Sequence, residues 1–276
     1  MPKVSNGDVE VAYEIHGEGP PVVLVQGLGG VGRSWQLVTE GLVDRGRTVV
    51  TVDNRGVGGT YMPRGVEWTV ADMAADVLAV ADACDLDTFH LAGLSMGGMI
   101  SQELLVTCPD RLRSVALLGT HYGMTSDPAA PPYVAPDPSA LAALANPIDR
   151  DDPVASARRM FELIAAPGFL DRHPERFELM LEVGREVPMP MRGFVAQFAA
   201  VSRWNSYDRL GPAPVPTVVV HGDADPLIPF ENGRNLADRL DVALRRLRGC
   251  GHMLFLEAPE ELVDVIDGQI GVPGPA

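Results

Sequence analysis

The chain has 276 residues, of which 46% are hydrophobic and 21% are charged, as is typical of a folded globular protein and not of a disordered one. Its net charge of −15, from 37 acidic and 22 basic side chains, argues against nucleic acid or an anionic membrane as a partner. Apolar runs such as residues 22–25 and 217–220 are far too short to span a membrane. Residues 1–10 are polar and show no signal-peptide pattern, so the expected location is cytoplasmic.

Strand and helix signals alternate along the first part of the chain. Residues 9–13 alternate apolar and polar side chains, as a half-exposed antiparallel strand does. Continuous, mostly apolar runs predict strands buried on both faces at residues 22–25, 48–52, 88–92 and 115–118. Before the third run, Thr69 precedes apolar residues spaced by three and four, and Asp72 is placed to complete a capping box, which predicts a helix. The alternation predicts βαβ crossovers and a mainly parallel sheet, and so the α/β class.

The pattern changes after Thr120. Prolines crowd residues 121–153 and are expected to stop any regular element there, and helices are expected at 154–166, 174–185 and near 191–204. Strand and helix signals then resume, with strands at 216–220 and 243–247 and helices near 231–240 and 259–269. The sequence therefore predicts an α/β core made of residues 1–121 and 207–276, with residues 122–206 inserted as a helical cap.

One short motif carries a chemical signal. Gly93-Leu94-Ser95-Met96-Gly97 follows the predicted strand at 88–92 and opens onto a helical stretch, so it matches G-x-S-x-G between a strand and a helix. Such a sharp turn strains the serine backbone, and the flanking glycines remove side chains that would collide there. The hydroxyl is then exposed at a helix N-terminus, where amides and the helix dipole favour a developing negative charge. Ser95 is the predicted nucleophile.

A serine hydroxyl needs an adjacent base, and two later segments supply candidates for a base and its partner. Gly251-His252 follows the predicted strand at 243–247, and Asp223 and Asp225 follow the strand at 216–220. Because the carboxyl ends of parallel strands share one edge of a sheet, we expect these groups to meet Ser95 there. His252 is the predicted base, and Asp225 or Asp223 would orient its imidazole.

Together these segments resemble the α/β-hydrolase superfamily, and within it the esterase-like serine hydrolases that carry a helical cap. The matching segments are residues 27–30, 53–56, 93–97, 221–225 and 251–252, which cover both halves of the core but not the insertion. The resemblance implies a triad of Ser95, Asp225 and His252 in the chain order that this fold uses. The family's H-G-x-x-D pattern selects Asp225, and Asp223 then becomes a turn former.

The resemblance also implies an oxyanion hole, formed by the backbone amides of Leu28 and Met96. Most relatives carry His-Gly in the first of these loops, whereas this chain has Gln26-Gly27. The family histidine braces the loop by hydrogen bonds. Glutamine can also donate and accept, so the loop geometry can survive the change.

The implied reaction is acyl transfer to water through an acyl-serine intermediate, which needs no metal or organic cofactor. We therefore expect a hydrolase for a carboxylic ester, thioester or lactone of a medium-sized apolar molecule, and a resemblance to polyketide esterases suggests secondary metabolism. Carbon–carbon bond hydrolysis, perhydrolysis and non-catalytic ligand binding under the cap are the alternatives. Ser95 argues against haloalkane dehalogenases and epoxide hydrolases, which use aspartate there, and the glycines at 27–30 do not fit a dinucleotide-binding G-x-G-x-x-G motif. The sequence leaves open whether the chain forms a homodimer.

The cap is where a substrate pocket is expected. It contains many thioethers and aromatic rings, which suit an adaptable apolar pocket. They are Met124, Met160, Met180, Met189, Met191, Phe161, Phe169, Phe194, Phe198 and Trp204. Packing on the undersides of the cap helices would explain the same residues equally well. His121 and Tyr122 stand at the entrance to the cap and are candidates for substrate contact or for packing.

Overall fold

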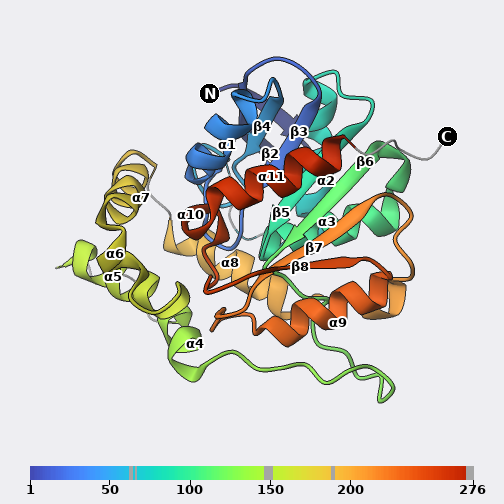
Figure 1. Cartoon of the computed structure of the whole chain (residues 1–276). Coiled ribbons are helices and arrows are strands. Elements are labelled where there is room, and N and C mark those ends of the chain that lie inside the picture. Colours follow the sequence, from blue (N-terminus) through green and yellow to red (C-terminus); the bar gives the residue numbers. More distant parts are fainter. Residues whose placement is uncertain (62–64, 66, 146–151, 188–189, 272–276) are drawn as a thin grey trace.

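In the computed structural model, which describes residues 1–61, 65, 67–145, 152–187 and 190–271, the chain folds around one central sheet (Figure 1). The described strands lie in the order β1-β2-β4-β3-β5-β6-β7-β8. They are β1 (Lys3–Asn6), β2 (Val9–His16), β3 (Pro21–Val25), β4 (Thr48–Val52), β5 (Phe89–Leu94), β6 (Leu112–Leu118), β7 (Thr217–Gly222) and β8 (Ala243–Leu247). The β1–β2 and β2–β4 pairs are antiparallel, and the pairs from β4 to β8 are parallel. The predicted α/β fold with a mainly parallel sheet is confirmed.

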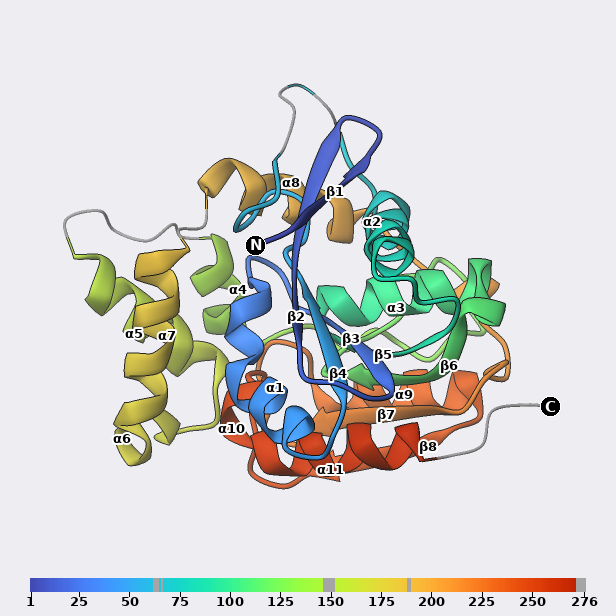
Figure 2. The same ribbon diagram turned by 90° about the horizontal axis from the view of Figure 1, so that it is seen from above.

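Helices cover both faces of this sheet (Figure 2). One face carries α1 (Gln36–Val43), α10 (Leu254–Glu257) and α11 (Pro259–Ile270), and the other carries α2 (Val70–Ala83), α3 (Met96–Thr107) and α9 (Phe230–Leu240). Side chains alternate along a strand, so Val22 and Leu24 of β3 join the first core while Val23 and Val25 join the second. Burial on both faces explains why these strands are continuously apolar.

Helix α2 begins where its capping residues predict. The Thr69 hydroxyl accepts a hydrogen bond from the Asp72 amide at 3.1 Å, and the Asp72 carboxylate accepts one from the Thr69 amide at 2.8 Å. These reciprocal bonds satisfy two amides that the first turn of a helix leaves without a partner. The predicted capping box is therefore confirmed.

The cap, by which we mean residues 122–206, contains five described helices. They are α4 (Pro138–Ala145), α5 (Pro153–Ile164), α6 (Phe169–Arg172), α7 (Pro174–Glu186) and α8 (Met191–Ser202). The expectation that prolines stop every element between 121 and 153 is wrong for α4. Pro138 is the first residue of that helix, where its missing N–H is not needed. None of the helices in the described part of the chain is long and apolar enough to cross a membrane.

Candidate active site

The turn after β5 has the geometry that the G-x-S-x-G motif predicts. Ser95 has φ 55° and ψ −115°, a strained combination for a residue with a side chain. A Cβ on Gly93 would lie 2.2 Å from the Gly97 carbonyl oxygen, and a Cβ on Gly97 would lie 2.1 Å from the Val25 carbonyl oxygen. Only glycine fits at both positions, and the tight turn leaves Ser95 at the start of α3.

His252 and Asp225 come together at the same edge of the sheet. The Nδ1 atom of His252 lies 2.8 Å from Oδ2 of Asp225, and both side chains are buried. A carboxylate only accepts hydrogen bonds, so the His252 proton is on Nδ1 and Nε2 is free to act as the base. The other oxygen of Asp225 accepts from the amides of Leu227, at 2.9 Å, and Ile228, at 2.8 Å.

Electrostatics keep Asp225 ionised. Burial raises the pKa of its carboxyl group, but the charge of His252 and hydrogen bonds from His221 and His252 outweigh burial and lower the pKa to about 2. Because folding lowers this pKa, the ionised carboxylate stabilises the fold above the ordinary carboxyl pKa, and that contribution is lost as the pH falls toward 2. Asp225 therefore remains charged throughout the neutral range.

The carboxylate of Asp223 makes contacts away from His252. It pairs with Arg246 at 2.6 Å and accepts the Gly249 amide at 2.6 Å. These bonds tie the turn after β7 to β8 and to the loop that follows β8. Of the two aspartates, Asp225 contacts His252, and Asp223 contacts Arg246 and the turn after β8.

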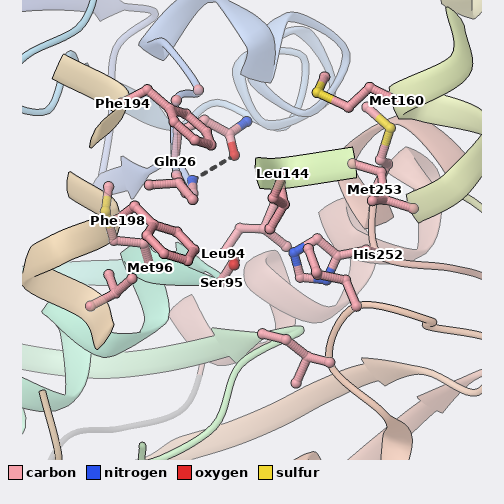
Figure 3. A pocket seen from close by; sticks show the side chains of 18 of the residues that line it. Gln26, Leu94, Ser95, Met96, Leu144, Met160, Phe194, Phe198, His252 and Met253 are labelled. Carbon is pink, nitrogen blue, oxygen red and sulfur yellow. Dashed lines mark hydrogen bonds between the residues drawn. The ribbon is translucent and has the colours of Figure 1, made fainter. Parts of the chain in front are cut away.

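Ser95 and His252 line the same cavity, and in Figure 3 the Ser95 side chain points toward the His252 ring. Within the described residues, the Ser95 hydroxyl makes no hydrogen bond. Catalytic bonds of this kind commonly tighten only when substrate binds. The structure thus brings the predicted nucleophile, base and orienting carboxylate to one place.

The oxyanion loop, residues 26–30, passes beside the nucleophile. An added Cβ on Gly27 would lie 3.1 Å from the Ser95 Cβ. Gln26 braces the loop by accepting the Gly27 amide on its side-chain oxygen at 2.9 Å, and its side-chain NH₂ group has no hydrogen-bond partner among the described residues. Within the described residues, the amides of Leu28 and Met96 donate to no protein acceptor, so both are available to an oxyanion.

A family model described as the alpha/beta hydrolase fold matches residues 20–259. The chain belongs to the alpha/beta hydrolase family. The resemblance inferred from the motifs is confirmed, and the family model spans the cap as well as both parts of the core.

Several hydrolase types are similar to this alpha/beta hydrolase. A protein of Variovorax paradoxus, provisionally named a carbamate hydrolase, is 30% identical over 249 residues that cover 87% of this chain and 88% of its own. A thermophilic esterase from Thermogutta terrifontis superposes with a TM-score of 0.79 and 25% sequence identity, and the match covers 96% of each chain. Est816, an N-acyl homoserine lactone degrading enzyme, superposes with a TM-score of 0.76 and 28% sequence identity. The match covers 97% of this chain and 99% of Est816. Against the first curated relatives, from Azorhizobium caulinodans and Mycobacterium tuberculosis, the match spans 42–44% of their length.

Between the core and the cap of this alpha/beta hydrolase lies a cavity of about 1520 Å³. Figure 3 shows Phe194 and Phe198 at the left and Met160 at the upper right, with Ser95 and His252 lower in the view, below Leu144. The predicted cap residues that line it are Met124, Met160, Met180, Met191, Phe161, Phe194, Phe198 and Trp204. Phe169 is buried outside the cavity, against His173, and Met189 lies outside the described residues.

The two residues at the cap entrance differ in position. Tyr122 is 3% exposed, packs against the Tyr207 ring and does not line the cavity, so its role is packing. His121 lines the cavity. Its Nδ1 accepts the Gly123 amide at 2.8 Å, which places the ring proton on Nε2. Of the two, only His121 stays a candidate for substrate contact.

Glu257 fixes the loop that carries His252, a role that the sequence analysis missed. Its carboxylate accepts the amides of Gly251 at 2.8 Å and Met253 at 3.0 Å, on either side of the histidine, and the amide of Ala166 in the cap at 2.9 Å. The His252 amide itself donates to the Ile164 carbonyl of the cap at 2.8 Å. In the sequence, the indication of this role is a carboxylate five positions after the histidine.

Glu257→Gln is expected to lower the free energy of unfolding by about 1–3 kcal/mol, because the new NH₂ group faces an amide donor and leaves it unpaired. Urea denaturation measures the change. Glu260→Gln is the matched control, since Glu260 is exposed on α11. Equal stability of the two variants would contradict the bracing role.

Proposed function

We propose that the protein is a serine hydrolase that cleaves a carboxylic ester, thioester or lactone of a largely apolar small molecule. The observation that carries the proposal is the placement of Ser95 and His252 in one cavity, with Asp225 hydrogen-bonded to the histidine and two amides available beside the serine. His252 takes the Ser95 proton as the hydroxyl attacks the carbonyl, and Asp225 stabilises the imidazolium. The imidazolium gives this proton to the leaving alcohol or thiol as the scissile bond breaks, and the neutral histidine then activates the water that releases the acyl group.

The cavity supports an apolar substrate. Its volume exceeds the range of about 300–1,000 Å³ that is usual for small-molecule sites, and its walls are mostly aliphatic, thioether and aromatic groups. An acyl or alcohol group with an extended apolar part would bury its surface there. The names of the relatives, an esterase, a lactone degrading enzyme and a provisional carbamate hydrolase, support acyl transfer to water.

A panel of p-nitrophenyl esters, acyl thioesters and lactones of increasing chain length tests the proposal. We expect kcat/KM to rise with chain length until the cavity is filled. A fluorophosphonate should label Ser95 in the folded protein and stop turnover. Failure to label Ser95 would refute the nucleophile, and turnover of a diketone but of no ester would favour carbon–carbon bond hydrolysis.

His121 is proposed as the polar contact in this apolar cavity. Burial, together with the charges of His221 and His252, lowers the pKa of His121 to about 4, so the ring is neutral in the assay range and donates from Nε2. An acceptor oxygen on the substrate, such as an ether or a hydroxyl, can receive this bond.

His121→Phe is expected to raise KM by about 2- to 10-fold for an ester with such an oxygen, the worth of one neutral hydrogen bond. KM for the all-carbon analogue should stay the same. Steady-state kinetics on the two esters measure the difference, and Tyr122→Phe is the control because Tyr122 does not line the cavity. Equal effects on both esters would leave His121 with a packing role only.

A further inference from the structure

The oxyanion loop is held by a residue from the cap. Three of its amides have protein acceptors: Gly27 donates to the Gln26 side chain at 2.9 Å, Gly30 to the Gly27 carbonyl at 3.1 Å, and Gly29 to the side-chain oxygen of Gln197 at 2.8 Å. The Leu28 amide, between them, has no acceptor among the described residues and is the one proposed to bind the oxyanion. Gln197 lies in α8, far along the chain from the loop.

Gln197 has a fixed position. Its side chain is 0% exposed, and its NH₂ group donates to the Arg55 carbonyl at 3.0 Å. The guanidinium of Arg55 is in turn held by both oxygens of Asp76, each at 2.7 Å, in a buried pair. The bridge therefore runs from a rigid part of the core, through the cap glutamine, to the oxyanion loop.

A close contact between two glycines brings α8 near enough for this bridge. A Cβ on Gly193 would lie 1.7 Å from the Gly56 carbonyl oxygen, and a Cβ on Gly56 would lie 2.8 Å from the Gly193 Cα. Gly193 and Gln197 are four residues apart and so share one face of the helix. The small residue allows the approach, and the long polar one reaches the loop.

We propose that Gln197 is a positioning residue for the oxyanion hole, contributed by the cap. It accepts the Gly29 amide and so orients the peptide unit that follows Leu28, whose own amide binds the oxyanion. The Leu28 amide belongs to the peptide unit between Gly27 and Leu28. The bonds made by the Gly27 and Gly29 amides hold the planar units on either side of it, so this unit is fixed at both of its Cα atoms. Removing Gln197 should weaken binding of the transition state more than binding of the substrate. This inference rests on the proposed function.

Gln197→Met tests the proposal, because methionine has a similar shape and neither bonds Gly29 nor Arg55. The matched control is Asn232→Leu. Asn232 is 3% exposed and joins core to cap through two bonds, accepting the Val134 amide at 2.9 Å and donating to the Val134 carbonyl at 2.8 Å. Within the described residues it makes no hydrogen bond to the oxyanion loop or to the Ser95 turn. Both variants remove a buried carboxamide that links core and cap.

We expect Gln197→Met to lower kcat by about 10- to 100-fold, less than the loss from deleting an oxyanion donor outright, with KM changed by less than about threefold. The rate of fluorophosphonate labelling should fall in parallel, since its phosphoryl oxygen occupies the same hole. Asn232→Leu should keep kcat within about twofold. Equal kcat for the two variants, or an effect on KM alone, would overturn the proposal.

Amide hydrogen exchange separates this inference from the proposed function. Residues 26–30 should exchange faster in Gln197→Met than in Asn232→Leu, whether or not any ester is turned over. Unchanged exchange there would overturn the positioning role. Absence of labelling and turnover in the wild-type protein, with faster exchange in the variant, would refute the hydrolase function and also the catalytic meaning of the bridge.

Discussion

Replacing Ser95 with glycine is expected to abolish hydrolysis and at the same time to stabilise the fold. The Ser95 backbone, at φ 55° and ψ −115°, lies in a region that glycine enters freely and that strains a residue with a Cβ. Relief of such strain is worth about 1–3 kcal/mol, and the extra freedom of glycine in the unfolded chain offsets about 0.4–1 kcal/mol of it. Loss of the nucleophile should lower kcat by about 10⁴-fold or more.

Ser95→Ala is the control that separates the two effects. Alanine also lacks the hydroxyl but keeps the Cβ, so this variant should be equally inactive without the gain in stability. Urea denaturation of the three proteins, beside ester hydrolysis, makes the comparison. If Ser95→Gly unfolds at no higher urea concentration than Ser95→Ala, the turn stores no backbone strain, and the glycines at 93 and 97 serve packing alone.

The sequence is sufficient to predict which strands carry the candidate site. Runs such as 22–25 and 48–52 are apolar because the sheet is covered on both faces, and that burial is readable from composition. Once the sheet is parallel, residues that follow β5, β7 and β8 must share one edge. Ser95, Asp225 and His252 were predicted on that basis, and the structure places them together.

Residues that act through tertiary contacts were not predictable in the same way. Gln197 reaches Gly29 across 168 positions of sequence, and no local pattern encodes that distance. The buried face of α8, with Gly193, Gln197 and Ala200, carries a small and polar stripe in place of the apolar one that marks a packed helix. Such a stripe is the signal available in sequence, and it identifies a close approach without naming its partner.

The choice between two aspartates shows a second limit. Asp223 and Asp225 both follow β7, and in the sequence only the resemblance to the family's H-G-x-x-D pattern selects Asp225. The structure does so through hydrogen bonds: Asp225 contacts His252, while Asp223 pairs with Arg246. What decides is the direction in which the turn after β7 points each side chain, which the amides of Leu227 and Ile228 fix by holding Asp225.

Asp225→Asn is therefore expected to lower kcat by about 10⁴-fold with little change in fold. The reason lies in the two amides, from Leu227 and Ile228, that donate to one carboxylate oxygen at 2.9 and 2.8 Å. An asparagine must turn its carbonyl oxygen toward these donors, which leaves its NH₂ group facing Nδ1 of His252. That nitrogen then has to accept, the ring proton moves to Nε2, and the histidine loses the lone pair that takes the Ser95 proton.

Asp223→Asn provides the comparison, since it is the same substitution two residues away. Its carboxylate contacts Arg246 and the Gly249 amide and no member of the triad, so kcat should stay within about threefold while the free energy of unfolding falls by up to about 1 kcal/mol. Ester hydrolysis gives the rates, and NMR of the imidazole N–H protons reports which ring nitrogen of His252 is protonated. A loss of kcat in Asp225→Asn with the proton still on Nδ1 would mean that charge, and not the position of the ring proton, is what Asp225 supplies to the histidine.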